Sequence, residues 1–184
     1  MNKIYAIYAE VEVPKPDKWL TDFRKKYSEP YDFHITLKQP CNIQELDASK
    51  IREKLERFFK NPKKQESFEV IFDYLFAPEQ KSCIMIGLKS GQNRIYDLQK
   101  ELVDIVQDYS DYAEPKSEQW EKNFVPHLTI GDDLNDERHL EAIKDLPGKI
   151  EIKGLVKQIV LVVAKEARPE QSLNPNNLIK FGLK

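Results

Sequence analysis

Phe33-His34-Ile35-Thr36-Leu37 and Pro126-His127-Leu128-Thr129-Ile130 are two copies of one pattern, one in each half of the chain. In an extended strand alternate side chains share a face, so each histidine lies beside its threonine while the apolar neighbours point the other way. The chain has three histidines and three threonines, so chance would give roughly 0.05 His-x-Thr pairs. A hydrogen-bonded structural histidine explains one such pair, but two matched pairs indicate a shared function.

The length and composition are those of one folded domain. A chain of 184 residues can bury a sizeable core, and 33 % charged residues provide a well-solvated exterior. No apolar run approaches the ~18 residues needed to span a bilayer, and the first residues lack a signal-peptide pattern. Two cysteines, Cys41 and Cys83, are too few for a disulfide framework or a Cys-rich zinc site. We therefore expect a cytoplasmic protein, with no membrane contact and two core thiols.

The charge balance limits the kind of partner. The chain has 29 basic and 31 acidic residues, so it lacks the basic excess of proteins that bind long nucleic acids through phosphates. A small cyclic nucleotide or one RNA end is compatible with this balance.

Apolar periodicity predicts the same order of elements twice. In the first half we expect strands at 3–13, 32–38 and 68–76, with helices at 17–28 and from Asp47 to Asn61, and Pro40 ending the second strand. In the second half we expect strands at 82–89, 124–130, 149–156 and 157–164, and helices at 91–109 and 135–146. A polar segment at 110–123 leads to the second His-x-Thr strand, and a last strand runs from Leu178 to Leu183.

Each His-x-Thr strand is therefore the third element of its own strand-helix-strand-helix-strand unit. Two such units related by an approximate two-fold axis would present both His-Thr pairs to one cleft. We expect residues 1–184 to form a single domain made of two similar lobes.

Two opposed imidazoles can perform acid-base chemistry on a phosphodiester. One neutral ring accepts a proton from water, and a second ring, kept charged by the phosphate, donates one to the leaving oxygen. The hydroxyls of Thr36 and Thr129 can donate hydrogen bonds to non-bridging phosphate oxygens. Metal binding is the competing chemistry, but two imidazoles alone are too few ligands for a zinc or iron site. Asp132 and Asp133 follow the second motif and could contribute carboxylates, yet Lys38 and Gln39 occupy the corresponding place after the first motif. We expect neither a metal nor another cofactor.

The duplicated motif and its placement resemble the 2H phosphoesterase superfamily, in particular its 2′-5′ RNA ligase-like and 2′,3′-cyclic phosphodiesterase branch. The resemblance rests on His34-Ile35-Thr36-Leu37 and His127-Leu128-Thr129-Ile130. It implies an α+β, bilobal, pseudo-two-fold fold in which antiparallel sheets line a central cleft and helices lie outside. It also implies that His34 and His127 are catalytic, that Thr36 and Thr129 bind the substrate phosphate, and that no metal takes part.

The activity implied by this resemblance is hydrolysis of a 2′,3′-cyclic phosphate on an RNA end or nucleotide by a monomer, with reverse 2′-5′ ligation as an additional activity. By resemblance His127 is the base and His34 the acid. Two alternatives stay open: a 2H enzyme for another substrate, such as a cyclic oligonucleotide or ADP-ribose cyclic phosphate, and a non-catalytic RNA- or nucleotide-binding module.

Residues around the motifs are open to two interpretations. Lys38 is interpreted as a solvated strand residue, with phosphate contact as the alternative. Four further residues could hold a base, although aromatic residues near buried strands are more often core: Phe33, Phe124, Trp120 and Arg168.

Overall fold

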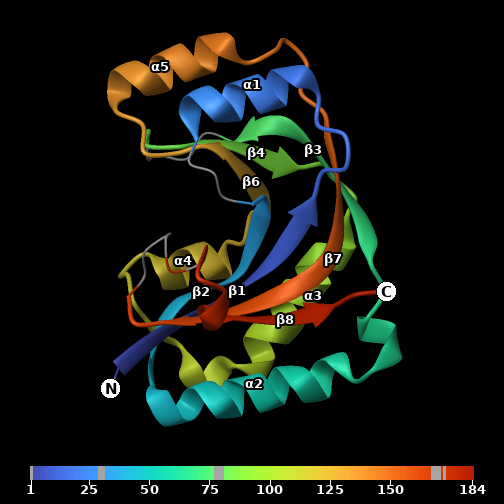
Figure 1. Ribbon diagram of the computed structural model, residues 1–184, viewed down its shortest axis with the longest axis vertical. Coiled ribbons are helices and arrows are strands. Elements are labelled where there is room, and N and C mark those ends of the chain that lie inside the picture. Colours follow the sequence, from blue (N-terminus) through green and yellow to red (C-terminus); the bar gives the residue numbers. More distant parts are fainter. Residues whose placement is uncertain (1, 29–31, 77–80, 167–170, 172) are drawn as a thin grey trace.

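The computed structural model describes residues 2–28, 32–76, 81–166, 171 and 173–184, and Figure 1 shows their arrangement. The strands are β1 (Asn2–Glu12), β2 (His34–Gln44), β3 (Phe68–Phe76), β4 (Ile84–Leu88), β5 (Asp111–Tyr112), β6 (His127–Gly131), β7 (Ile152–Ala164) and β8 (Leu178–Gly182). The helices are α1 (Lys18–Tyr27), α2 (Glu45–Phe59), α3 (Asn93–Ile105), α4 (Ser117–Lys122) and α5 (Asp136–Asp145). None of the described helices is both long enough and apolar enough to cross a membrane.

One antiparallel sheet runs through the described residues. Its strand order is β5-β2-β1-β7-β3-β4-β6, and β8 pairs with β7 beside this path. In Figure 1, β3, β4 and β6 lie with α1 and α5 in the upper part, whereas β1, β2 and β8 lie with α2 and α3 in the lower part. The long strand β7 connects the two parts, because its first residues pair with β3 and its later residues with β1. The predicted α+β fold with antiparallel strands and outer helices is confirmed.

The strand pairing follows the predicted repeat. Each His-x-Thr strand pairs with the first strand of its own unit, as β2 does with β1 and β6 with β4. Each unit's third strand pairs with the other unit's first strand, as β3 does with β4 and β7 with β1. The first helix of each unit likewise contacts the His-x-Thr strand of the other unit, since α1 contacts β6 and α3 contacts β2.

The sheet also brings the two His-x-Thr strands together. β2 and β6 lie near opposite ends of the strand order, yet they are in contact. The sheet must therefore curl, which places both motifs in the same region of the molecule.

The core is built from the faces that the periodicity predicts. Alternate residues of β1 from Tyr5 to Val11 are buried, and Tyr5, Ile7 and Ala9 among them are fully buried. Helices α1, α2 and α3 each contribute an apolar stripe at spacings of three or four residues: Leu20, Phe23 and Tyr27 on α1, Ile51, Leu55 and Phe59 on α2, and Ile95, Leu98 and Leu102 on α3.

The prediction that Pro40 ends its strand is wrong. β2 continues to Gln44, and Pro40 lies at a shift in the register between β2 and β1. Tyr5 pairs with Cys41 and Ile7 pairs with Lys38, so two residues of β2 lie opposite one residue of β1. A bulge leaves residues outside the regular ladder, so the missing N–H of a proline is tolerated there. Asp47 likewise does not begin α2: the helix starts at Glu45, and Asp47 accepts a hydrogen bond from Lys50.

Two strands predicted at 149–156 and 157–164 form the single strand β7. Gly154, the one turn-forming residue inside it, serves close packing instead. A Cβ at Gly154 would lie 2.4 Å from Cγ1 of Val11, so a larger residue would collide with β1. The polar segment at 110–123 contains β5 and α4. Both are too short to produce a recognisable apolar periodicity in the sequence.

Candidate active site

His34 is oriented by its own backbone. Its Nδ1 lies 3.1 Å from the carbonyl oxygen of Asp32. A carbonyl only accepts hydrogen bonds, so Nδ1 carries the proton and Nε2 is the basic nitrogen. Within the described part of the chain Nε2 has no hydrogen-bond partner. The ring of Tyr8 lies beside it, with ring centroids 5.0 Å apart.

His127 repeats this arrangement in the other half. Its Nδ1 lies 2.7 Å from the carbonyl oxygen of Val125, two residues earlier. The ring stacks on Phe76 at 5.7 Å with an interplanar angle of 29°. Both histidines therefore direct Nε2 away from the backbone as a proton acceptor.

The two imidazoles lie in one partly desolvated region. The His34 side chain is solvent-accessible, yet desolvation is the main cause that lowers its pKa, with the charge of Arg24 adding to the effect. The pKa of His127 is also lowered, first by burial and further by the charge of His34. The two rings thus interact electrostatically, in agreement with the contact between β2 and β6.

The threonines lie on the same faces as their histidines. Thr36 and Thr129 are half-buried, and their neighbours across the sheet are Tyr8 and Met85. Each hydroxyl is two residues from its histidine along a strand, which keeps both side chains on one face. The structure thus brings together the four residues predicted from the two motifs.

Several residues beside the motifs were missed by sequence reasoning. Gly87 is the strand partner of His127, and a Cβ on it would come within 2.1 Å of Tyr74 Cζ. The phenol of Tyr74 therefore lies over Gly87 in the row of His127, and Phe76 occupies the row of Thr129. Alternation in β3 places Tyr74 and Phe76 on one face, but only the strand order shows which histidine they adjoin.

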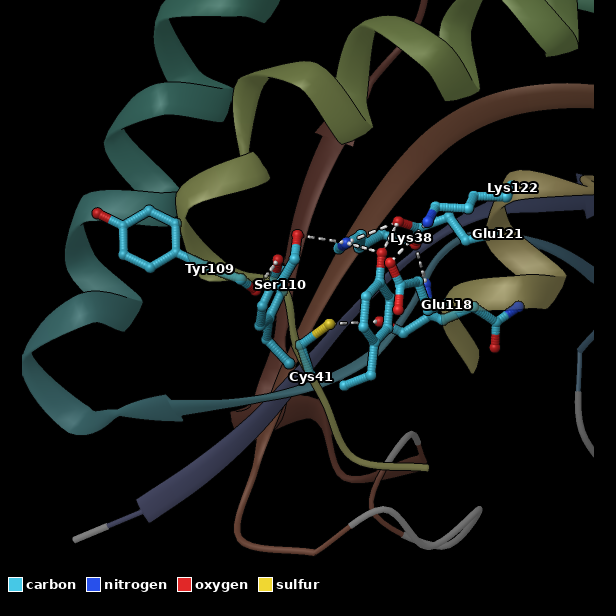
Figure 2. A network of polar contacts seen from close by, with 10 residues as sticks. Lys38, Cys41, Tyr109, Ser110, Glu118, Glu121 and Lys122 are labelled. Atoms are coloured by element: carbon cyan, nitrogen blue, oxygen red, sulfur yellow. Dashed lines mark hydrogen bonds and ion pairs between the residues drawn. The ribbon is translucent and has the colours of Figure 1, made fainter. Parts of the chain in front are cut away.

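The interpretation of Lys38 as a solvated residue is wrong. Its side chain is 0 % exposed, and Nζ lies 2.8 Å from Glu121 Oε1. Lys38 pairs with the core residue Ile7, whereas Thr36 pairs with the next residue, Tyr8, so an extra residue interrupts the alternation. This bulge turns Lys38 away from the histidine face and into the network shown in Figure 2.

Other candidates have structural surroundings. Phe33 is half-buried under the Arg24 guanidinium, 4.1 Å from its ring centroid, and Phe124 packs edge-on against Tyr96. Trp120 is exposed on α4, and Arg168 lies outside the described residues.

The cysteine and carboxylate candidates also have assigned surroundings. Burial raises the pKa of Cys41 to about 11, which makes it a poor nucleophile, and Cys83 is half-buried. Among the described residues no three His, Cys, Asp or Glu side chains, Asp132 and Asp133 included, cluster as a metal site.

Comparisons with known proteins agree with this geometry. A Bacillus pumilus (strain SAFR-032) protein named as a phosphoesterase is 26 % identical over 145 residues, which cover 71 % of this chain and 74 % of that one. Escherichia coli LigT, solved with 3′-AMP, superposes with a TM-score of 0.59 at 12 % identity over 100 % of this chain and 96 % of that chain. Usb1 of Kluyveromyces marxianus gives a TM-score of 0.55 at 14 % identity over 98 % of both chains.

The family profile described as the 2′-5′ RNA ligase superfamily matches residues 12–168, a span that includes both motifs. The chain therefore belongs to the 2′-5′ RNA ligase superfamily of 2H phosphoesterases.

Proposed function

We propose that this protein is a metal-independent phosphodiesterase that opens a 2′,3′-cyclic phosphate on an RNA end or a nucleotide. The observation that carries this proposal is the matched geometry of His34 and His127. Each ring has Nδ1 bound to the carbonyl two residues earlier, and each presents Nε2 in the same partly desolvated region. Two identically held imidazoles that affect each other's charge are suited to serve one phosphate as base and acid.

The proposed reaction is an in-line displacement at phosphorus. Nε2 of His127 takes a proton from water while the water oxygen forms a bond to phosphorus. The bond between phosphorus and the 3′ oxygen breaks, and Nε2–H of His34 protonates that oxygen. The product carries a 2′-phosphate, and the hydroxyls of Thr36 and Thr129 donate hydrogen bonds to the non-bridging oxygens. Exchange with solvent returns both histidines to their starting protonation states.

Protonation of His34 depends on the substrate in this mechanism. Desolvation lowers the pKa of His34, so the ring is neutral in the free protein near pH 7. A phosphate bound beside the ring favours the imidazolium form by its negative charge. The acid therefore becomes charged only when a phosphate is bound, whereas His127 is neutral and ready to accept a proton.

The substrate class is supported by the neighbouring aromatic residues and by the relatives. Tyr74 is 43 % exposed beside His127, and Phe76 lies in the adjacent row, so both offer ring faces for a base. LigT has been solved with 3′-AMP and Usb1 with uridine monophosphate. We propose that the same region of this protein takes a nucleotide or an RNA end. A single domain spanning residues 1–184, action as a monomer and a cytoplasmic location are parts of this proposal.

The test is a panel of substrates incubated with the protein in excess EDTA, with product identity determined by mass spectrometry. The panel contains a short RNA with a 2′,3′-cyclic phosphate, free 2′,3′-cyclic nucleotides, a cyclic dinucleotide and ADP-ribose cyclic phosphate. Turnover of the first two to 2′-phosphates supports the proposal. Turnover of only the last two would identify another 2H activity, and binding without turnover would identify a nucleotide-binding module. Mixing an RNA acceptor that carries a 5′-hydroxyl with the cyclic RNA tests ligation, because this hydroxyl takes the place of water in the attack on phosphorus.

A further inference from the structure

Lys38 and Glu121 form a buried ion pair that the proposed chemistry does not use. Their side chains are 0 % and 4 % exposed, and Lys38 Nζ lies 2.8 Å from Glu121 Oε1. Removing two charges from water offsets most of their mutual attraction, so such a pair contributes little net stability compared with apolar side chains. What such a pair can supply is a fixed geometry between the segments that it joins.

The ammonium group of Lys38 and both carboxylate oxygens of Glu121 are hydrogen-bonded. Lys38 Nζ also donates to Ser110 Oγ at 3.0 Å, and the Tyr112 hydroxyl donates to Glu121 Oε1 at 2.6 Å. The second carboxylate oxygen, Oε2, accepts the backbone N–H of Gln39 at 3.0 Å. These groups come from three separate segments: β2, residues 110–112 at β5, and α4. Figure 2 shows Lys38 between Ser110 and Glu121. The network thus fastens residues 110–121 to the strand of the first motif.

The chain leads directly from this network to the second histidine. Glu121 is four residues before Val125, whose carbonyl oxygen accepts the 2.7 Å hydrogen bond from His127 Nδ1. The next residue, Pro126, accepts a hydrogen bond from the N–H of Leu88 through its own carbonyl. The segment 122–126 is therefore held at one end by Glu121 and at the other by β4.

The two histidines differ in how much they depend on such an anchor. His34 begins a strand that pairs with β1 from Glu10 back to Asn2. His127 begins the five-residue strand β6, which is last in the strand order and pairs with β4 among the described residues. The position of the Val125 carbonyl thus depends on the segment before it, which the network holds. The Asp32 carbonyl, which holds His34, makes no hydrogen bond with this network among the described residues.

We propose that the Lys38–Glu121 pair is a positioning clamp that sets the Val125 carbonyl and thereby the tautomer and direction of the His127 ring. Lys38 and Glu121 are positioning residues, since they act through the backbone of the second motif. The consequence for turnover rests on the proposed function. The consequence for the imidazole does not, so the two can fail separately.

The experiment compares three variants with the parent protein. Glu121→Gln keeps the side-chain shape but removes the charge from the clamp. Lys38→Met together with Glu121→Leu replaces the pair by apolar groups, which keeps the interior satisfied if the single change does not fold. Glu118→Gln is the matched control, because Glu118 lies on the same helix in an exposed ion pair with Lys122. All are studied at a temperature where circular dichroism shows them folded.

The first readout is the tautomer of each histidine, measured from the ring 15N shifts without substrate. In the parent we expect both rings to carry the proton on Nδ1. In Glu121→Gln and in the double variant we expect His127 to shift toward the Nε2–H form, with His34 and the Glu118→Gln control unchanged. Folded clamp variants with a parent-like His127 signal would overturn the proposal and leave the pair as a packing feature.

The second readout is kinetic, on any substrate that the panel identifies. A misdirected base lowers kcat by about 10- to 100-fold with little change in KM, because substrate contacts are kept. Parent-like kcat in a folded clamp variant would contradict the proposal, whatever its thermal stability. If the parent turns over nothing, the proposed function fails, but the 15N shifts still decide the clamp.

Discussion

His34 on β2 and His127 on β6 are held alike but surrounded differently. Each ring donates from Nδ1 to the carbonyl two residues earlier, so both rings are held in the same tautomer by a main-chain oxygen. The residues across the sheet diverge: Glu10 is the strand partner of His34, whereas Gly87, covered by Tyr74, is the partner of His127. The duplicated scaffold thus holds both histidines alike, while their neighbours differ: Glu10 and Tyr8 lie beside His34, and Phe76 lies beside His127. Such a site suits an asymmetric substrate around one phosphate.

The strands also differ four residues after each histidine. Lys38 occupies this position in β2 and is buried against Glu121, whereas Gly131 occupies it in β6. A Cβ at Gly131 would lie 3.4 Å from Ile84 and from the Tyr27 carbonyl, so this strand packs closely against α1. One strand is thus fixed by charge and the other by close backbone packing.

The largest effect is expected from removing either histidine. His34→Ala and His127→Ala should each lower kcat by roughly 10²–10⁴, the usual contribution of a positioned acid or base. The double variant should lose less than the product of both losses, since groups that act together are non-additive. Steady-state rates on the substrate from the panel measure this, with His139→Ala as the control on α5. Near-normal turnover in one variant would show that this histidine is structural and that the two histidines do not act as acid and base.

The next effect concerns the residues four positions after the histidines. Lys38→Met leaves the buried Glu121 carboxylate without its cationic partner, and should reduce the free energy of unfolding by about 3–5 kcal/mol. Gly131→Ala adds only a methyl group at contact distance and should cost much less. Urea titrations of both variants give the comparison. Equal losses would show that β2 and β6 are fixed by the same kind of packing.

The threonines test whether the phosphate is held symmetrically. Thr36→Val and Thr129→Val each remove one hydrogen-bond donor and should lower kcat by at most about 10²–10³. Similar losses are expected if both hydroxyls contact the transition state. A loss confined to one variant, measured on the same substrate, would assign phosphate binding to one half only.

The next test compares the aromatic residue Tyr74, which lies beside His127, with Tyr8, which lies beside His34. Tyr74→Ala should weaken the binding of a nucleotide substrate by about 1–3 kcal/mol if the ring stacks on a base, which raises KM by roughly 5- to 150-fold. Tyr8→Phe, beside His34, keeps its ring and should change KM little. Michaelis curves for the two variants decide this, and an unchanged KM in Tyr74→Ala would place the base elsewhere.

The smallest effect is on pH dependence. Both histidines have pKa values below their ordinary value, so between their folded pKa and about 6.5 the unfolded chain binds more protons. Stability from these groups is therefore complete above about pH 7 and decreases as pH falls below about 6.5. Urea unfolding between pH 5 and 8 should show this slope, and it should weaken in a His34→Gln, His127→Gln variant. In His34→Gln alone, NMR titration should show the pKa of His127 rising, since the charge of His34 lowers it.

Sequence patterns predict those features that depend on local periodicity. The His-Thr pairs, the amphipathic helices and the repeated order follow from residue spacing, and the strand pairing reflects that order. Lys38 could not be predicted, because a bulge turns it from the histidine face and its partner Glu121 is distant in the chain. Tyr74 beside His127 depends equally on the exchange of strands between the halves.

The pairing of the two histidines around one phosphate is tested most directly by titrating adenosine 2′-phosphate into 15N-histidine-labelled protein in EDTA. We expect the ring signals of His34 and His127 to shift together with one dissociation constant, the pKa of His34 to rise on binding, and His139 not to respond. A response from only one of the two rings, or two separate dissociation constants, would contradict it.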